Sequence, residues 1–167
     1  MKYYHYTVPA YLKRIIEDGK ILLSNPSSKY VKPIVWVSSN PLIELTSLKG
    51  SFDITGEYRS LTFEEQNGMV GCARIEIDPK VLIKWSVLKH KAGYKKIESK
   101  TGVSISDELE ADIEGNPNEW FGSLYPITEK HFLNFEVYNG KEWVEFTDDY
   151  VVPNGGMAQR DFEELAA

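Results

Sequence analysis

Cysteine and histidine are scarce in this sequence of 167 residues, which contains one cysteine, Cys72, and three histidines. A single cysteine excludes both an intramolecular disulfide and a zinc site built on cysteines. The histidines, His5, His90 and His131, stand far apart and form no metal-binding pattern. We therefore expect no bound metal ion.

Long apolar segments and common catalytic motifs are also missing. No stretch approaches the roughly 18 consecutive apolar residues of a transmembrane helix, and the first residues lack the apolar run of a signal peptide. The sequence has no P-loop, no Gly-x-Gly-x-x-Gly, no His-Glu-x-x-His and no Gly-x-Ser-x-Gly. We expect a cytoplasmic protein without a membrane partner, and no familiar motif identifies its chemistry.

The remaining composition is that of an ordinary globular domain, with 42% hydrophobic and 26% charged residues. The length fits one domain, residues 1–167. Its 19 basic and 25 acidic residues leave a formal net charge of −6, which disfavours non-specific binding to nucleic acid. Seven lysines nevertheless fall between residues 80 and 100, either as a local basic patch or as a solvated helix face.

The N-terminal quarter predicts a strand, a helix and a second strand. Aromatic residues favour a strand at Tyr3–Tyr6. Thr7 and Pro9 predict the start of a helix that Gly19 ends. Apolar, β-branched residues predict a strand at Ile34–Ser38, and the residues after it suit a short helix up to Leu48.

Later segments predict more strands than helices, while residues 50–68 show no clear pattern. The expected elements are a strand at 69–78, a helix from Ser104 or Ser106 to Ile113, an extended segment at 119–125, a hairpin at 134–146 with a two-residue Asn139-Gly140 turn, and a peripheral tail helix at 154–167. Strands and helices do not alternate regularly. We therefore expect an α+β fold with mixed or antiparallel sheets of short strands.

Two polar clusters lie at the ends of predicted strands, where ligands often bind. His5, Tyr6 and Thr7 end the first strand, although His5 also fits a half-buried strand residue with a satisfied hydrogen bond. Trp36 is followed by Ser38, Ser39 and Asn40, which also suit a helix cap and a turn. Glu44 could reach this second cluster from a first helical turn.

Two later glutamates stand among aromatic residues. Glu119 precedes Trp120 and Phe121, and a carboxylate partly removed from water by such neighbours can have a pKa suited to catalysis. The alternative is that Glu119 faces water while the aromatic residues face the core. Glu136 has the same surroundings in weaker form, on the polar face of a hairpin strand.

Several of these pieces resemble the ADP-ribosyltransferase superfamily. The order His5-Tyr6-Thr7, a helix rich in Leu and Ile, and then Gly19-Lys-Ile-Leu-Leu-Ser24 is similar to the opening of DNA-targeting ADP-ribosyltransferase toxins and of related small phage and bacterial proteins. The resemblance covers residues 3–48 and, more loosely, 116–146. It departs from the common His-Tyr-Glu pattern, since Trp36 stands where a tyrosine is usual and the glutamate is not uniquely assigned.

The resemblance implies an ADP-ribosyltransferase-like fold and an NAD-dependent mono-ADP-ribosyltransferase, such as a toxin or a phage-encoded modifier. It implies that His5 binds the ribose of NAD and that Tyr6 and Trp36 contact the nicotinamide. The further residues expected to bind NAD are Thr7, Ser38 and Ser39. Glu119 is the first choice for the catalytic carboxylate and Glu136 the second. Lys13, Arg14 or Arg74 would meet the phosphates, and the acceptor would be a protein or a nucleic acid.

Two other functions remain open at this point. Members of such families that lose the glutamate also lose activity, so the chain could be a non-enzymatic module on the same fold that binds a nucleotide signal or a host protein. The lysines between 80 and 100 suggest a nucleic-acid-processing protein, which the acidic net charge opposes.

Overall fold

The computed structural model describes residues 1–26, 28–96, 102–112 and 114–151. Its centre is a seven-stranded sheet in which all paired strands run antiparallel. From one edge to the other, the strands are β11 (Trp143–Glu145), β10 (Phe132–Tyr138), β6 (Ala73–Ile77), β1 (Tyr4–Thr7), β3 (Val35–Ser38), β8 (Trp120–Ser123) and β7 (Ile83–Lys84). The expected α+β class with antiparallel sheets is confirmed.

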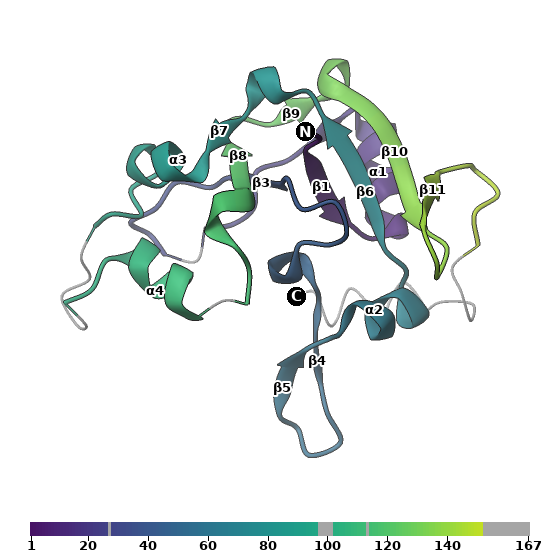
Figure 1. Cartoon of the computed structure of the whole chain (residues 1–167), viewed down its shortest axis with the longest axis horizontal. Helices are drawn as coiled ribbons and strands as arrows, with labels where there is room; N and C mark the ends of the chain where they lie inside the picture. Colours follow the sequence, from purple (N-terminus) through teal and green to yellow (C-terminus); the bar gives the residue numbers. More distant parts are fainter. Residues whose placement is uncertain (27, 97–101, 113, 152–167) are drawn as a thin grey trace.

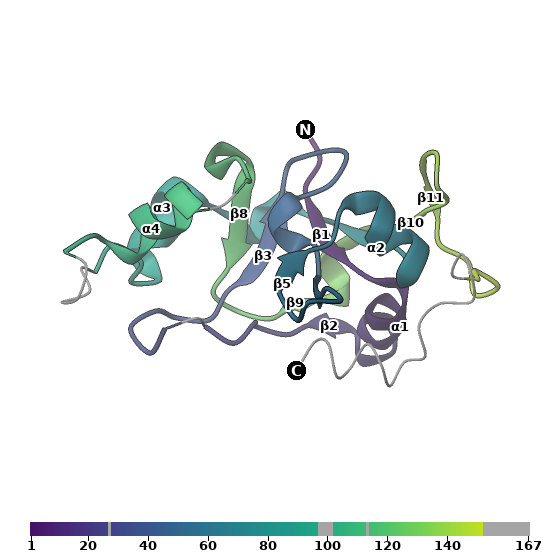
Figure 2. The same cartoon turned by 90° about the horizontal axis from the view of Figure 1, so that it is seen from below.

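Helices and two small sheets surround this central sheet (Figure 1). The helices are α1 (Pro9–Asp18), α2 (Phe63–Met69), α3 (Trp85–Lys91) and α4 (Ile105–Asp112). The small sheets pair β2 (Lys20–Ile21) with β9 (Ile127–Thr128), and β4 (Gly50–Phe52) with β5 (Tyr58–Ser60). Seen from below, α3 and α4 lie at one end of the molecule and α1 near the other (Figure 2). No helix in these described ranges is long and apolar enough to cross a membrane.

The central sheet is nearly split between β1 and β3. β1 pairs with β6 at four positions, and β3 pairs with β8 at four positions. Between β1 and β3, however, the register contains the single pair Tyr4–Ser38. Beyond that pair the two strands no longer form a ladder. His5 and Trp36 therefore lie where the two halves of the sheet separate.

Two main clusters of buried residues pack against the central sheet. The first cluster is mainly aliphatic and spans both halves of the sheet, since it includes Leu12 of α1 and Ile75 of β6 together with Val37 of β3. The half with β3 and β8 packs an aromatic cluster, in which Trp85, Tyr94 and Trp120 are buried. Burial of apolar surface is the main force that holds such layers together. The opening between the halves is thus bordered by aromatic side chains on the β3 side.

The predicted N-terminal elements are confirmed, with one difference at the helix start. Gly19 ends α1 in a left-handed conformation, with φ of 64°, which glycine adopts without strain. The residue that caps α1 is Val8, which makes no side-chain cap hydrogen bond. Thr7 cannot serve as the cap because its backbone belongs to β1 and pairs with Ala73 of β6.

Other expectations hold in part. The 134–146 hairpin is present, but Asn139 pairs through its N–H with the carbonyl of Glu142, so its turn centres on Gly140 and Lys141 instead of on Asn139-Gly140. The helix expected before Leu48 is a single 3-10 turn at Leu45–Ser47. The expected tail helix at 154–167 lies outside the described residues.

The segment without a clear pattern, residues 50–68, forms the β4–β5 hairpin and most of α2. The hairpin projects from the body of the molecule (Figure 1). A capping box starts α2: the Thr62 side chain accepts from the backbone N–H of Glu65, and the Glu65 side chain accepts from that of Thr62. This Thr-x-x-Glu signal is visible in the sequence and could have predicted the helix.

Candidate functional site

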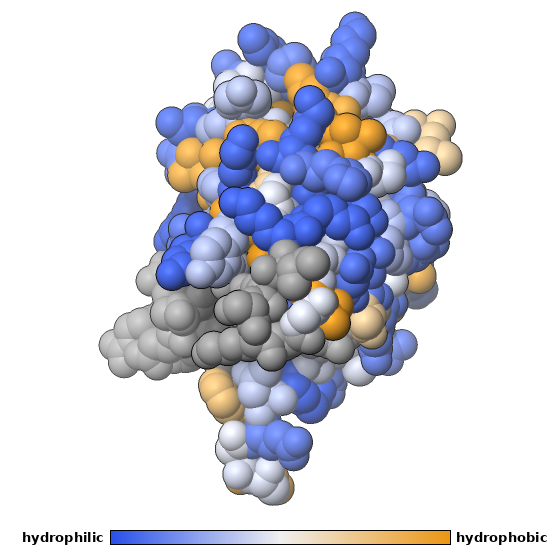
Figure 3. Space-filling model, turned by 90° about the vertical axis from the view of Figure 1, so that its left-hand side faces the viewer, coloured by the Kyte–Doolittle hydropathy of each residue, from blue (hydrophilic) through white to orange (hydrophobic). Residues whose placement is uncertain are grey.

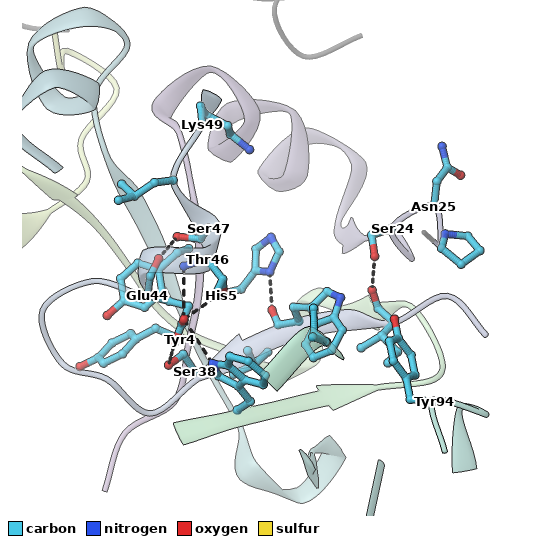
Figure 4. Close-up of a pocket in the computed structure, with 18 residues that line it drawn as sticks. Tyr4, His5, Ser24, Asn25, Ser38, Glu44, Thr46, Ser47, Lys49 and Tyr94 are labelled. Carbon is cyan, nitrogen blue, oxygen red and sulfur yellow. Dashed lines mark hydrogen bonds between the residues drawn. The ribbon is translucent and has the colours of Figure 1, made fainter. Parts of the chain in front are cut away.

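A pocket of about 470 Å³ opens where β1 and β3 diverge. Its walls come from β1, β3, the chain at 24–26, the segment that joins β3 to β4, and the aromatic cluster. Its volume lies within the usual range of small-molecule sites, which is about 300–1,000 Å³. Figure 4 shows the side chains that line it. Four of the predicted site residues, His5, Tyr6, Trp36 and Ser38, line this pocket.

His5 bridges the two diverging strands through its side chain. Its Nδ1 atom lies 2.9 Å from the carbonyl oxygen of Trp36, and because a carbonyl only accepts, Nδ1 carries the hydrogen. Burial lowers the pKa of His5, and the nearby ammonium of Lys49 lowers it further. The ring is therefore neutral near pH 7, and its Nε2 atom is a hydrogen-bond acceptor for a donor such as a sugar hydroxyl.

Glu44 is the carboxylate of the pocket. It is buried, with 7% of its surface exposed, and follows β3 by a short loop. One oxygen accepts from the Ser38 hydroxyl at 2.7 Å. The other accepts from the backbone and hydroxyl of Thr46, at 3.3 and 3.0 Å, and from the indole N–H of Trp120 at 3.2 Å. The expectation that Glu44 reaches the second polar cluster is confirmed.

Asn40 gives the loop between Ser38 and Glu44 its shape. Its side-chain oxygen accepts from the backbone N–H groups of Leu42 and Ile43, at 2.9 and 3.3 Å. Such a side-chain turn reverses the chain and directs it back toward the strand end. Asn40 therefore acts as a turn residue, as one of the two interpretations of this cluster predicted, and the turn brings Glu44 into the pocket.

Aromatic side chains form much of the pocket wall. Trp36 is half-buried, with its ring centre 5.3 Å from that of Trp85 and 6.5 Å from that of Trp120. Tyr6 donates its hydroxyl to the backbone carbonyl of Asn40, and burial raises its pKa above the usual value. A flat apolar wall with a few polar groups suits an aromatic ligand ring.

The other predicted site residues lie outside the pocket lining. Thr7 is buried on β1, and Ser39 donates its backbone N–H to the carbonyl of Glu119. Glu119 is half-buried at the end of a 3-10 turn, where its side chain accepts from Asn40 at 3.1 Å. Glu136 on β10 forms an ion pair with Arg74 at 2.7 Å. Glu119 and Glu136, the two glutamates favoured as the catalytic carboxylate, are therefore not among the residues that line the pocket.

Lys49 is a cation of the pocket that the sequence analysis did not predict. It lines the cavity together with His5 and Glu44. The cations suggested by the sequence lie elsewhere: Lys13 and Arg14 are exposed on α1, and the Arg74 side chain is committed to Glu136. Nothing in the local sequence distinguishes Lys49 from its neighbours, because its role depends on how β4 and α2 place it.

In the described part of the lysine-rich stretch, residues 80–96, two lysines form ion pairs with α4. Lys89 on α3 lies 2.8 Å from Glu110 on α4, and Lys95 lies 2.9 Å from Asp107. The side of the molecule that carries α3 and α4 shows a mostly hydrophilic surface with separate apolar patches (Figure 3). These ion pairs favour the interpretation as a solvated face over an open basic patch.

Comparisons of the chain with protein-family models, with curated proteins and with solved structures found no significant match. Function must therefore be inferred from the chemistry of the pocket, since a fold class alone hosts many activities.

Proposed function

We propose that the chain is an NAD-dependent mono-ADP-ribosyltransferase whose substrate binds in the pocket between β1 and β3. The observation that carries the proposal is that His5, Trp36 and Glu44 line one cavity. The first two were singled out from the sequence for this function. Their convergence at the split in the sheet supports a site that receives a ribose and an attached aromatic ring.

Each of the three side chains has a chemical role in this proposal. The Nε2 atom of His5 accepts from a ribose hydroxyl of NAD. The Trp36 ring provides the apolar surface against which nicotinamide packs. As the bond between nicotinamide and ribose breaks, its electron pair leaves with nicotinamide, and positive charge develops on the ribose. The carboxylate of Glu44 stabilises that charge until a nucleophile of the acceptor bonds to the ribose carbon and loses its proton.

Glu44 takes the place for which the sequence favoured Glu119. The distinction rests on position, because Glu44 lines the pocket whereas Glu119 is held by Asn40 outside the lining. Electrostatic stabilisation requires a charge close to the reacting centre, in a site from which water is largely excluded. The buried position of Glu44 meets this requirement better.

The test is release of nicotinamide from NAD by the purified chain, with and without cell extract, beside the variant Glu44→Gln. We expect release to fall at least a hundredfold in this variant. Glutamine preserves the local structure, since its oxygen accepts from Thr46 and Trp120 while its amide donates to Ser38, whose hydroxyl can rotate. Glu142→Gln, at the exposed β10–β11 turn, is the matched control. Equal rates in the wild-type chain and Glu44→Gln would reject Glu44 as the catalytic carboxylate.

One observation favours a second candidate, a non-enzymatic module that binds a nucleotide signal or a host protein. Both oxygens of Glu44 already accept hydrogen bonds, from four donors in total, as in a carboxylate with a structural role. This candidate predicts that NAD or a related nucleotide raises the melting temperature while no nicotinamide is released. Release of nicotinamide that depends on Glu44 would exclude it.

A further inference from the structure

Lys49 lies in the pocket wall and carries a positive charge. It is half-buried, and among the residues that the structure describes no carboxylate forms an ion pair with it. Its Nζ atom lies 5.9 Å from the centre of the Tyr11 ring. An ammonium that is partly removed from water and has no counter-charge is unfavourable. A ligand that brings negative charge would remove this cost.

The backbone holds Lys49 firmly at this position. Its N–H donates to the side-chain oxygen of buried Gln66 at 2.7 Å, and its carbonyl accepts from Leu61 at 2.8 Å. The next residue, Gly50, lies against Tyr58 so closely that a Cβ atom would be 1.9 Å from the tyrosine hydroxyl oxygen. The lysine is therefore presented to the pocket by a fixed segment between the 3-10 turn and β4.

The ammonium of Lys49 and the free nitrogen of His5 lie on the same side of the pocket. Figure 4 shows the ammonium of Lys49 above the His5 ring and on the side opposite to the bond between Nδ1 and the Trp36 carbonyl. In the same view Glu44 lies to the left of the ring and below it. Burial lowers the pKa of Lys49, which an adjacent anion would oppose. A hydroxyl acceptor beside a cation is the arrangement that a phosphorylated sugar requires.

We propose that Lys49 binds a phosphate group of the ligand, so that the pocket selects a sugar phosphate or nucleotide over the corresponding uncharged nucleoside. For NAD the group is its pyrophosphate, and to that extent the inference rests on the proposed function. In a chain of net charge −6, a phosphate needs such a local cation. Lys49 thus supplies charge recognition, while His5 and Trp36 recognise the sugar and the ring.

The experiment measures Kd for ADP-ribose and for adenosine by calorimetry, with the whole chain and the variants Lys49→Met and Lys49→Arg. Methionine keeps the length of the side chain without its charge, and the exposed Lys141→Met is the matched control. We expect Lys49→Met to raise the Kd for ADP-ribose by about tenfold to a hundredfold. Adenosine should bind equally to all four proteins, and Lys49→Arg should recover most of the affinity for ADP-ribose.

Several results would overturn the proposal. They can be distinguished from results that reject only the enzymatic function. The inference is wrong if ADP-ribose does not bind the wild-type chain, or if it binds Lys49→Met as tightly. Binding of ADP-ribose that depends on Lys49, in a chain that releases no nicotinamide, would support the phosphate site and reject the transferase. If Lys49→Met does not fold, competition decides: inorganic pyrophosphate should displace ADP-ribose from the wild-type chain, and failure to do so rejects the site.

Discussion

Arg74 on β6 donates from Nε to the carboxylate of Glu136 on β10 at 2.7 Å, and both side chains are largely buried. A second guanidinium nitrogen donates to the carbonyl of Pro41 at 2.5 Å. The guanidinium also lies over the rings of Tyr4 and Trp143, 3.8 and 4.3 Å from their centres. Arg74 therefore joins the edge of the sheet to the loop that carries Glu44 toward the pocket.

Replacement of Arg74 by methionine should destabilise the fold by about 3–5 kcal/mol, because it leaves the Glu136 carboxylate buried without a partner. Urea denaturation measures this change in the free energy of unfolding. Arg59→Met is the control, since the Arg59–Glu65 pair is exposed and should contribute little. Similar losses of unfolding free energy in the two variants would show that the Arg74–Glu136 pair stabilises the fold no more than the exposed pair does.

His5 should make stability depend on pH below its usual pKa of about 6.5. Burial lowers the pKa in the folded chain, so the unfolded chain binds more protons between the two pKa values. The contribution of His5 to the free energy of unfolding is therefore complete above pH 6.5. It is lost as the pH falls toward the pKa of the folded chain, by at most about 1.4 kcal/mol per pH unit.

The measurement compares the free energy of unfolding at pH 7.5 and pH 5.5 in the wild-type chain and in His5→Gln. Glutamine can still donate to the Trp36 carbonyl but does not titrate, so the variant should lose less stability at the lower pH. His90→Gln, at an exposed position, should behave like the wild-type chain. An identical pH dependence in His5→Gln would contradict the prediction.

Cys72 should be unreactive in the folded chain. It has no exposed surface, and burial raises the pKa of its thiol to about 12, so almost no thiolate forms near pH 7. We expect a thiol reagent to label it no faster than the chain unfolds, and at once in denaturant. Ser60→Cys adds a thiol on the exposed face of β5 and should be labelled immediately. Rapid labelling of Cys72 under native conditions would show that the chain opens locally just before β6.

Local patterns were sufficient for several elements of the fold. The aromatic run of β1, the helix between Pro9 and Gly19, and the β3 segment follow from strand preference, helical spacing and a left-handed cap, all of which act between near neighbours in the chain. A local signal also exists for α2, because the capping box from Thr62 to Glu65 is contained in the sequence. Turn position was less certain, as the shift from Asn139-Gly140 to Gly140-Lys141 shows.

The residues that meet in the pocket were only partly predictable. The sequence by itself pointed to His5, Tyr6, Trp36 and Ser38, because polar groups at strand ends are local features. Glu44 was a possible partner, whereas Glu119 and, in weaker form, Glu136 had the aromatic neighbours that favoured them in the sequence. A carboxylate among aromatic residues looks the same in the sequence whether it faces the pocket, an asparagine or an arginine.

Only the tertiary structure decided which charged groups share the cavity. The pairing of β1 with β3 stops after Tyr4–Ser38, and that divergence opens the pocket. Glu44 enters it through a turn made by Asn40, and Lys49 through backbone bonds to the region of α2. These contacts join segments of the chain through strand register and side-chain packing, which composition and local spacing do not specify. The sequence determined the fold class and part of the site, and long-range packing determined the charges that give the site its chemistry.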